Sequence, residues 1–391
     1  MTGVATHKLA DVAKILSGYA FDSGCFADSG DLPIIRIRDV VRGYSNTFYT
    51  GDFSETFVVK NGDLLIGMDG EFNTALWRGG RAVLNQRVCK VIPDESVIDK
   101  AYLYYLLPKE LKAIEDATSF VTVKHLSVKS LQAIEIPLPP LPEQKRIAAI
   151  LDKADVIRRK RQQAVKLTEE LLRSVFLDMF GDPVTNPKGW VEARLEDVAE
   201  IVSGVTKGRK LDGKPTVMAP YLRVANVQDG YLDLKEIKEI EVLPPDVAKY
   251  RLEVGDVLLT EGGDPDKLGR GSVWHGQVTD CIHQNHIFRV RSKTDKLMPD
   301  FLSMLIGSER GKRYFLRAAK QTTGIASINS TQLKNFPVLL PSPALQQQFA
   351  QTVTNSQKLQ QRLSDAADTA DSLFNSLLQR AFRKIIYGCH K

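Results

Sequence analysis

Side chains that donate or accept hydrogen bonds gather after two similar stretches of the sequence. GDLLIGMDG spans residues 62–70, and GDVLLTEGG spans residues 255–263. Each reads as Gly-Asp, a run of apolar residues, and a polar loop that contains glycine. Arg suits the edge of guanine, Asn or Gln suits adenine, and Asp or Glu can accept from cytosine, so these residue types are able to read DNA bases. For any single residue, a role as a solvated loop residue or as a capping residue is as well supported as contact with a base.

The candidate DNA-contacting residues lie in these loops, in the strands that follow them, and at basic positions suited to phosphates. They are Arg36, Arg38, Asp69, Glu71, Asn73, Arg78, Asn85, Gln86, Arg87, Lys124, Arg223, Glu261, Asp264, Lys267, Arg270, His283, Gln284, Asn285 and His286. Glycines in the loops permit tight turns and a close approach of the backbone to a groove. Trp77 and Trp274 are alternatively packing anchors.

No catalytic pattern accompanies these loops. The sequence has neither Asp/Asn-Pro-Pro-aromatic nor Phe-x-Gly-x-Gly, so a stand-alone adenine methyltransferase is not expected. GRKLDGKP (208–215) ends in Pro where a phosphate loop needs Ser or Thr, and we interpret it as an ordinary loop. His275, Cys281, His283 and His286 lack finger-like spacing, so zinc is not expected either. The sequence therefore predicts no catalytic, cofactor-binding or metal-binding residues.

The doubled loop belongs to a tandem repeat. LADVAKILSG (9–18) returns as LEDVAEIVSG (195–204), and IIRIRDV (34–40) returns as YLRVANV (221–227). NQRVCKV (85–91) returns as QNHIFRV (284–290), and PLPPLPEQ (137–144) as PSPALQQQ (341–348). Along the chain the shift grows from 186 through 187, 193 and 199 to 204. A constant order with a growing shift indicates a duplication with insertions in the second copy.

Each copy begins with a stretch of mixed structure. Short apolar or alternating runs such as FVVK, DLLIGM and RVCKVI predict strands. Residues 99–114 and 298–315 predict helices, because each opens with Asp or with Pro-Asp. Strands mixed with a few helices favour an α/β (α+β) recognition domain. From the pattern alone, an α+β fold of any function stays open.

Each copy ends in a long helix. Residues 141–180 contain no Gly and, beyond Pro142 in the first turn, no Pro; the stretch from 344 to 387 contains neither. Ile147, Ile150, Ala154, Ile157, Ala164, Leu171 and Val175 fall on a 3-4 spacing, as do Leu363, Ala366, Ala370, Leu373 and Leu377. Such a helix is roughly 58 Å long at ~1.5 Å per residue and cannot bury its apolar stripe alone. We expect the two helices to form an antiparallel coiled coil with a weak seam. IRRKRQQ (157–163) is a solvated or subunit-docking face, or else a DNA patch.

Composition fits a soluble globular protein. The 391 residues are 43% hydrophobic and 26% charged, with a net charge of +6, which is compatible with a polyanionic partner. Four scattered cysteines imply no disulfide framework and favour the cytoplasm. No apolar leader or run of about 18 apolar residues is present, so we expect neither export nor membrane insertion.

These residues resemble the specificity (S) subunit of type I restriction–modification enzymes over nearly the whole chain. The motifs are SGYAF (17–21) with PIIRIRDV, the segment 62–88, LLTEGGDPDKLGRGSVWHG with CIHQNHIFRVR, and IPLPPLPEQKRIAAILDKAD (136–155). The last resembles the family's junction into its first long helix. The second junction departs from it, with Gln347 at the place of Glu143, and Phe349 and Ala350 at the places of Lys145 and Arg146.

The resemblance implies a non-catalytic subunit that binds double-stranded DNA between two modification subunits. Those partners would bring S-adenosylmethionine and methylate adenine N6, and added restriction subunits would bring ATP-driven cleavage. It also implies that each recognition domain reads half of a bipartite site while the helices fix the spacer. We expect recognition domains at 1–140 and 183–343, and spacer helices at 141–182 and 344–391. A self-contained restriction enzyme and a coiled-coil scaffold that binds no DNA are the alternatives.

Overall fold

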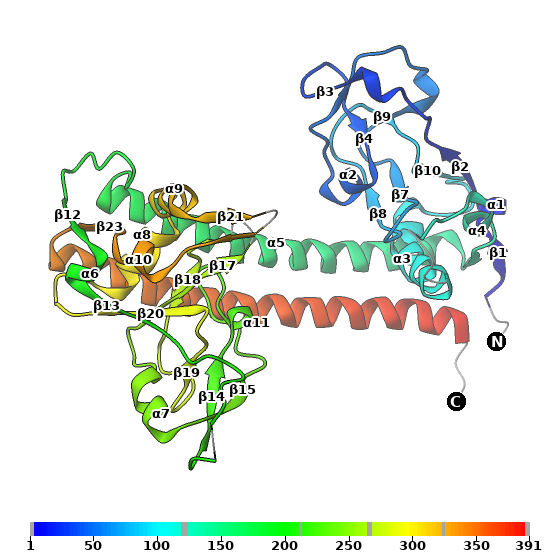
Figure 1. The fold of residues 1–391 in the computed structure, drawn as a ribbon. Helices are drawn as coiled ribbons and strands as arrows, with labels where there is room; N and C mark the ends of the chain where they lie inside the picture. The colour runs from blue at the N-terminus through cyan, green and yellow to red at the C-terminus, as the bar shows by residue number, and fades with distance from the viewer. Residues whose placement is uncertain (1–3, 119–123, 212, 264–267, 323–324, 388–391) are drawn as a thin grey trace. The chain divides into compact units, whose positions relative to one another are not determined.

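The chain forms two compact units connected by long helices. The computed structural model describes residues 4–118, 124–211, 213–263, 268–322 and 325–387. The first unit comprises the described residues up to Gln162 together with those from Asp365 onward, and the second comprises Gln163–Ser364 (Figure 1). Each unit therefore contains part of both long helices, α5 (Leu141–Phe180) and α11 (Pro343–Tyr387).

The first unit is a mixed α/β domain. Its helices are α1 (Leu9–Val12), α2 (Ile37–Arg42), α3 (Lys100–Ala117) and α4 (Val128–Gln132), with 3₁₀ turns at Ser23–Cys25 and Glu55–Phe57. Its strands are β1 (Thr6–Lys8), β2 (Ala13–Ser17), β3 (Phe26–Ala27), β4 (Ile34–Ile35), β5 (Phe48–Tyr49), β6 (Val58–Val59), β7 (Leu64–Gly67), β8 (Thr74–Leu76), β9 (Ala82–Leu84), β10 (Val88–Pro93) and β11 (Glu135–Pro137). They pair as sheets β2-β10-β7-β8, β4-β9-β6, β1-β11 and β3-β5.

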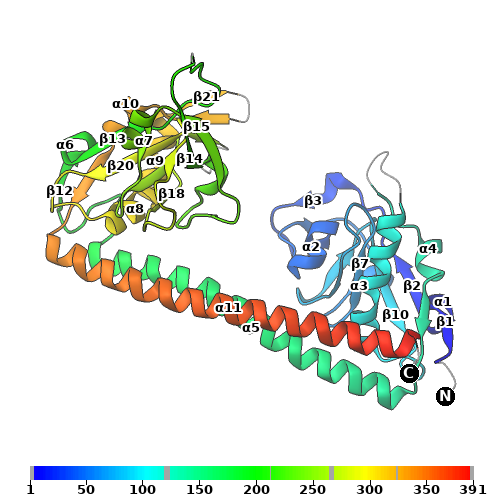
Figure 2. The ribbon, with the colours of Figure 1, turned by 90° about the horizontal axis from the view of Figure 1, so that it is seen from below.

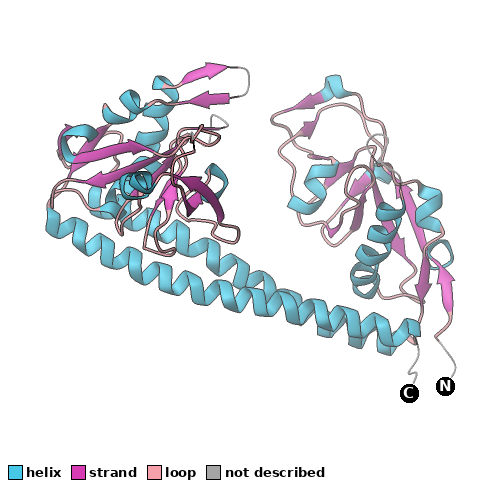
Figure 3. Ribbon diagram, turned by 60° about the horizontal axis from the view of Figure 1, so that its bottom comes forward, coloured by secondary structure: helices cyan, strands magenta, loops and turns pink. Residues whose placement is uncertain are grey.

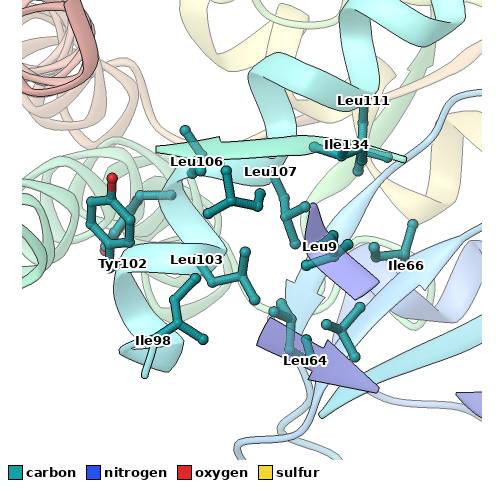
Figure 4. Close-up of a cluster of buried hydrophobic side chains, with 14 of the residues drawn as sticks. Leu9, Leu64, Ile66, Ile98, Tyr102, Leu103, Leu106, Leu107, Leu111 and Ile134 are labelled. Atoms are coloured by element: carbon teal, nitrogen blue, oxygen red, sulfur yellow. The ribbon is translucent and has the colours of Figure 1, made fainter. Parts of the chain in front are cut away.

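The main core of this unit lies between α3 and the sheet of β2, β10, β7 and β8 (Figure 2). The Asp99 carboxylate caps α3 by accepting a hydrogen bond from the Tyr102 backbone N–H at 2.9 Å, which satisfies one of the backbone donors that the first turn leaves without a partner. Figure 4 shows Leu103, Leu106 and Leu107 of α3 facing Leu64 and Ile66 of β7, and all five side chains are fully buried.

The second unit repeats this plan with insertions. Its helices are α6 (Leu195–Val198), α7 (Pro244–Tyr250), α8 (Pro299–Gly307), α9 (Glu309–Ala318) and α10 (Ser330–Lys334), with a 3₁₀ turn at Val224–Asn226. Its strands are β12 (Val191–Arg194), β13 (Ala199–Ser203), β14 (Val217–Leu222), β15 (Lys238–Val242), β16 (Val257–Thr260), β17 (Gly262–Gly263), β18 (Gly271–Val273), β19 (Ile282–His283), β20 (Ile287–Ser292), β21 (Lys320–Thr322), β22 (Ile325–Ser327) and β23 (Pro337–Leu340). They pair as β13-β20-β16-β18, β15-β14-β19, β12-β23 and β17-β22-β21. Figure 3 shows the strands of both units in magenta and the helices in cyan.

Strand pairing supports the tandem repeat. The antiparallel order β2-β10-β7-β8 in the first unit matches β13-β20-β16-β18 in the second, and the parallel pair β4-β9 matches β14-β19. Ile35 pairs with Leu84 in the first copy, and Leu222 pairs with His283 in the second, so the shifts of 187 and 199 hold at these strands. The repeat is therefore structural as well as sequential.

At the helix junctions, the predicted repeat register is wrong by two residues. Matched residues of the two copies lie 202 positions apart there, and not 204. Gln144 and Gln346 are both fully buried, and their side-chain amides make the same set of hydrogen bonds. Leu345 therefore matches Glu143, and Gln347 and Gln348 match Lys145 and Arg146. Phe349 matches Ile147, which is also buried. The two junctions still differ in charge on their exposed faces.

In each unit, a stretch of α5 lies beside a stretch of α11. In the first unit the Arg158 guanidinium lies 4.6 Å from the centre of the Phe374 ring. In the second, Gln360 donates a hydrogen bond to Glu169 at 3.0 Å, and the Phe176 and Phe349 rings lie 5.5 Å apart. Gln162 also donates to Asp371 at 3.3 Å in the first unit. Within each unit, therefore, the contacting residue of α11 comes earlier in the sequence as the contacting residue of α5 comes later.

The burial of these helices differs from the predicted stripe. Ile150, Ile157 and Leu171 are 42%, 51% and 59% exposed, and Leu373 of α11 is 57% exposed. The buried side chains of α11 among the described ones are Gln346, Phe349, Val353, Ala367, Phe374 and Phe382. The reason is that the globular parts, as well as the partner helix, cover these helices, so burial does not follow a two-helix seam alone.

Two local predictions had different outcomes. Residues 298–315 do not form one helix, because Ser308 is extended and separates α8 from α9. The described part of 208–215 contains no helix or strand, as expected for a loop. No helix among the described residues is both long and apolar enough to cross a lipid bilayer.

Candidate nucleic-acid interface

The segment Asn85–Arg87 forms a tight turn between β9 and β10. Tyr19 fixes this turn, because its backbone N–H donates to the Leu84 carbonyl at 2.9 Å and its carbonyl accepts from the Gln86 N–H at 2.8 Å. Gly18 lies so close to the turn that an added Cβ would overlap the carbonyl oxygen of Asn85. Gln86 and Arg87 are exposed, whereas Asn85 is buried and its side chain accepts from the Gln86 N–H.

Beside this turn, three charged or polar side chains meet. The Asp69 carboxylate lies 2.5 Å from Nδ1 of His125 and 3.5 Å from Nε of Arg87. Nδ1 of His125 also lies 3.2 Å from a terminal nitrogen of Arg87. His125 was not among the predicted site residues, because it is 56 residues from Asp69 in sequence and reaches it only through a β-bridge. We call Asp69, Arg87 and His125 the first-copy cluster.

The second copy builds the same backbone with other side chains. The Val205 N–H donates to the His283 carbonyl at 2.8 Å, and the Asn285 N–H donates to the Val205 carbonyl at 2.9 Å. On this turn, Nδ1 of His286 lies 2.7 Å from the Glu261 carboxylate. We call Glu261 and His286 the second-copy pair. Their side chains are 32% and 54% exposed, so the imidazole is accessible to a ligand.

His283 was predicted to contact DNA, but the structure places it in the core. Its side chain is fully buried, with Nδ1 3.1 Å from the Tyr250 carbonyl oxygen and Nε2 3.3 Å from that of Val202. Burial lowers the pKa of His283 from 6.5 to about 4, so the imidazole is neutral near pH 7. A buried neutral ring with both nitrogens facing carbonyls belongs to the core and does not reach a base.

Two of the predicted basic residues hold the domain fold. Arg36 donates to the Thr47 hydroxyl, and its backbone N–H donates to Asp39 at 3.0 Å. At the matched place, Arg223 donates to the Glu236 carboxylate at 3.1 Å and its backbone N–H donates to Asn226 at 2.9 Å. These contacts engage one terminal nitrogen of each guanidinium, whereas the buried Nε atoms of Arg36 and Arg223 have no hydrogen-bond partner among the described residues.

The other predicted residues have varied surroundings. Arg38, Glu71 and Arg78 are exposed, and Asn73, Arg270, Gln284 and Asn285 are partly buried. The Lys124 amine donates to the Glu115 carbonyl at 2.7 Å. Arg270 lines a hollow of about 340 Å³ together with Tyr231 and Lys312. Asp264 and Lys267 lie outside the described residues.

The described part of the chain contains no group of three or more His, Cys, Asp or Glu side chains placed to hold a metal ion. Cys281 and His283, which the sequence places near His286, are both buried. Burial also raises the pKa of the Cys281 thiol to about 12, which disfavours the thiolate that a metal needs.

Known proteins match both copies of this fold. The family described as "Type I restriction modification DNA specificity domain" matches residues 1–167 and again 187–366. The type I restriction enzyme EcoBI specificity subunit of Escherichia coli is 31% identical over 404 residues, which covers 95% of this chain and 84% of that protein.

Solved structures show the same fold at low identity. A type I restriction–modification S subunit from M. genitalium matches with a TM-score of 0.58 and 14% identity, over 96% of this chain and 95% of that one. A structure described as underlying complex assembly and conformational transition of the type I R-M system has a TM-score of 0.51 and 17% identity, over 99% and 98% of the chains. Because the family model matches both copies and the EcoBI subunit aligns with 95% of this chain, the chain belongs to the type I restriction–modification specificity family.

Proposed function

We propose that the chain is the DNA-reading, non-catalytic subunit of a type I restriction–modification complex. The recognition domains, 1–140 and 183–343, each read one half of a bipartite site in double-stranded DNA. The observation that carries this proposal is the doubled turn, because one backbone presents Gln86 and Arg87 in the first copy and Asn285 and His286 in the second. These side chains differ in the base edges that they can bind, so two unlike half-sites are expected.

The chemistry belongs to partner subunits. Two modification subunits supply S-adenosylmethionine and methylate adenine, and restriction subunits, where present, supply ATP-driven cleavage. This assignment is supported by the family match and by the structure described as concerning complex assembly of a type I system. The cytoplasm, where such a complex meets DNA, is the proposed location.

We propose that α5 and α11 form an antiparallel coiled coil that also docks the modification subunits. Ile150 and Ile157 lie seven residues apart on α5, Leu171 follows fourteen residues later, and all three apolar side chains are exposed. A stripe of this kind is suited to pack against helices of another chain. Two basic residues near this stripe already form ion pairs within α5, because Asp155 binds Arg158 at 2.7 Å and Arg159 at 3.0 Å.

The test of function is methylation mapping with the complete complex. The chain combined with modification subunits should methylate one bipartite motif, whereas the purified chain alone should neither methylate nor cut DNA. Methyl transfer by the chain free of modification subunit would contradict the non-catalytic assignment. Duplex binding should weaken steeply as salt rises, because phosphate contacts release counterions; salt-independent or absent binding would favour a scaffold without a DNA role.

The docking proposal has its own test. Ile157→Lys combined with Leu171→Lys places charges on the apolar stripe and should reduce co-purification of modification subunits by at least 10-fold. The matched control, Lys153→Glu combined with Lys166→Glu, changes exposed charged positions of the same helix. Retained assembly in the apolar-stripe variant would place docking elsewhere.

The spacer role is tested by lengthening both helices. Four residues inserted after Arg161 and four after Ala366 add one turn to each helix, ~6 Å at ~1.5 Å per residue. At ~3.4 Å per base pair, the spacer should grow by one or two pairs while both half-sites stay unchanged. The helix interior is the correct place, because Trp190 and Lys188 donate to the last carbonyls of α5 and an insertion at Gly181 would break these contacts. An unchanged spacer in an active complex would exclude a ruler.

A further inference from the structure

We propose, on the basis of the proposed function, that Arg87 reads a guanine in the half-site of the first copy. In this assignment Asp69 and His125 are positioning residues: Asp69 holds the guanidinium, His125 holds Asp69, and neither contacts a base. The sequence pattern places Asp69 and Arg87 in the same set of candidate base contacts. Their geometry separates their roles.

The carboxylate of Asp69 is occupied by its neighbours. One oxygen lies 2.5 Å from Nδ1 of His125, and the other lies 3.5 Å from Nε of Arg87. An ionised carboxylate only accepts hydrogen bonds, so the imidazole carries the proton that it donates to Asp69. The Asp69 side chain is 21% exposed, against 52% for Arg87. Asp69 is therefore the more buried member of the first-copy cluster, and Arg87 is the member that a ligand can reach.

The guanidinium is held from one side and open on the other. Its Nε faces Asp69, and Nη1 lies beside His125 at 3.2 Å. Among the described residues, Nη2 has no hydrogen-bond partner. Arg binds guanine through two parallel N–H groups that reach O6 and N7, and this needs a guanidinium plane that is fixed before binding. Asp69 supplies that orientation through Nε, and His125 fixes the Asp69 carboxylate in turn.

The backbone of Arg87 gives a second, independent observation. Its φ is +72°, in the left-handed region that favours Gly or Asn. Its carbonyl accepts from the Met68 N–H at 2.8 Å, which fixes the turn against the end of β7. A long side chain at such a position costs about 1 kcal/mol relative to Gly. Unfavoured backbone geometry at an exposed, held arginine is typical of a functional position.

The experiment maps methylated motifs with the complete complex carrying single variants. Arg87→Asn suits the left-handed backbone and removes the guanidinium, and Arg87→Lys keeps the charge but removes the paired N–H groups. Both should lower the discrimination for one guanine in the first half-site by about 10- to 100-fold. Asp69→Asn and His125→Ala should slow methylation about 3- to 10-fold and weaken the same guanine requirement less than the Arg87 variants do, without creating a preference for another base.

Three results would overturn the assignment. These are an unchanged guanine requirement in both Arg87 variants, a new base preference in Asp69→Asn, or loss of both half-sites in either Arg87 variant. The matched control, His286→Asn, should leave the first half-site intact. Failure of the proposed function is a separate result, because the unaltered complex would then show no bipartite motif.

Discussion

The two recognition turns share one backbone and hold different side chains. In the first copy, an aspartate contacts both an arginine and a histidine from a distant segment. In the second, a glutamate contacts a histidine whose other ring nitrogen lies 3.4 Å from the Asn285 amide. The backbone of both turns is fixed by equivalent hydrogen bonds, from Met68 to Arg87 at 2.8 Å and from Glu261 to His286 at 3.0 Å. The two copies therefore keep the same backbone position for the exposed side chain, while the type of side chain at that position differs.

The strongest test of the shared backbone concerns the two buried glutamines. In each copy the amide accepts one backbone N–H and donates to two carbonyls, all within 2.8 to 3.1 Å. Gln144→Ala or Gln346→Ala leaves these buried groups without partners and should reduce the free energy of unfolding by about 4 kcal/mol. Urea unfolding with hydrogen exchange along the full chain measures the loss. The exposed controls Glu143→Ala and Gln347→Ala should change it by less than about 0.5 kcal/mol. Unequal losses in the two copies would break the equivalence of the junctions.

The matched glycines should show a slightly smaller effect. An added Cβ at Gly18 would overlap the Asn85 carbonyl oxygen, and one at Gly204 would overlap that of His283. Gly18→Ala and Gly204→Ala should each destabilise their own unit by about 3 kcal/mol and impair only the corresponding half-site. Hydrogen exchange and motif mapping check the two parts. Gly24→Ala, where the added atom has ordinary contacts, is the control. Impairment of both half-sites by one substitution would argue against independent readers.

Lowering the pH should destabilise the second unit more than the first, because His283 occupies the position that Leu84 has in the first copy. The folded pKa of His283 is about 4, below the ordinary 6.5, so the fold favours the neutral ring. The free energy of unfolding is therefore unaffected by the titration of His283 above pH 6.5 and decreases as the pH falls toward 4. At pH 5 the decrease should be about 2 kcal/mol. Urea unfolding at pH 7 and pH 5 should show this loss in the second unit. His283→Leu should remove the extra loss; if acid sensitivity persists in this variant, another group is responsible.

The smallest expected difference lies on the exposed faces of the junctions. Glu143 binds Arg146 with two hydrogen bonds of 2.7 Å, which lowers the pKa of Glu143, whereas the matched residues Leu345 and Gln348 have no such pair. Arg146→Gln should change the unfolding free energy by less than about 0.5 kcal/mol, because exposed pairs are screened by solvent. A loss above 1 kcal/mol in urea unfolding would give this pair a structural role.

Sequence reasoning predicted the elements with local signals. The C-terminal end of α5 at Phe180 precedes Gly181, and α11 (Pro343–Tyr387) contains no Gly and no Pro after its first residue. Repeated motifs also predicted matched strands, because burial constrains the same positions in both copies. The junction register was missed by two residues, since Gln144 and Gln346 are recognised only by the groups that they bind.

The candidate site was only partly predictable. Gln86, Arg87, Asn285 and His286 were proposed from their types and from their place after repeated strands, and the structure puts them on matched turns. The contact of His125 with Asp69 depends on tertiary pairing, which leaves no local pattern. The burial of His283 was also hidden, since a strand with alternating residues does not show which face meets the core.

The most direct measurement maps methylated motifs for one variant in each copy. Glu71→Ala combined with Asn73→Ala changes the loop of the first copy, and Arg270→Ala combined with Asn285→Ala changes that of the second. If each copy reads one half-site, the first variant should alter only one half of the motif and the second only the other half. Alteration of both halves by either variant, or of neither half by both, would contradict the division of the chain into two independent readers.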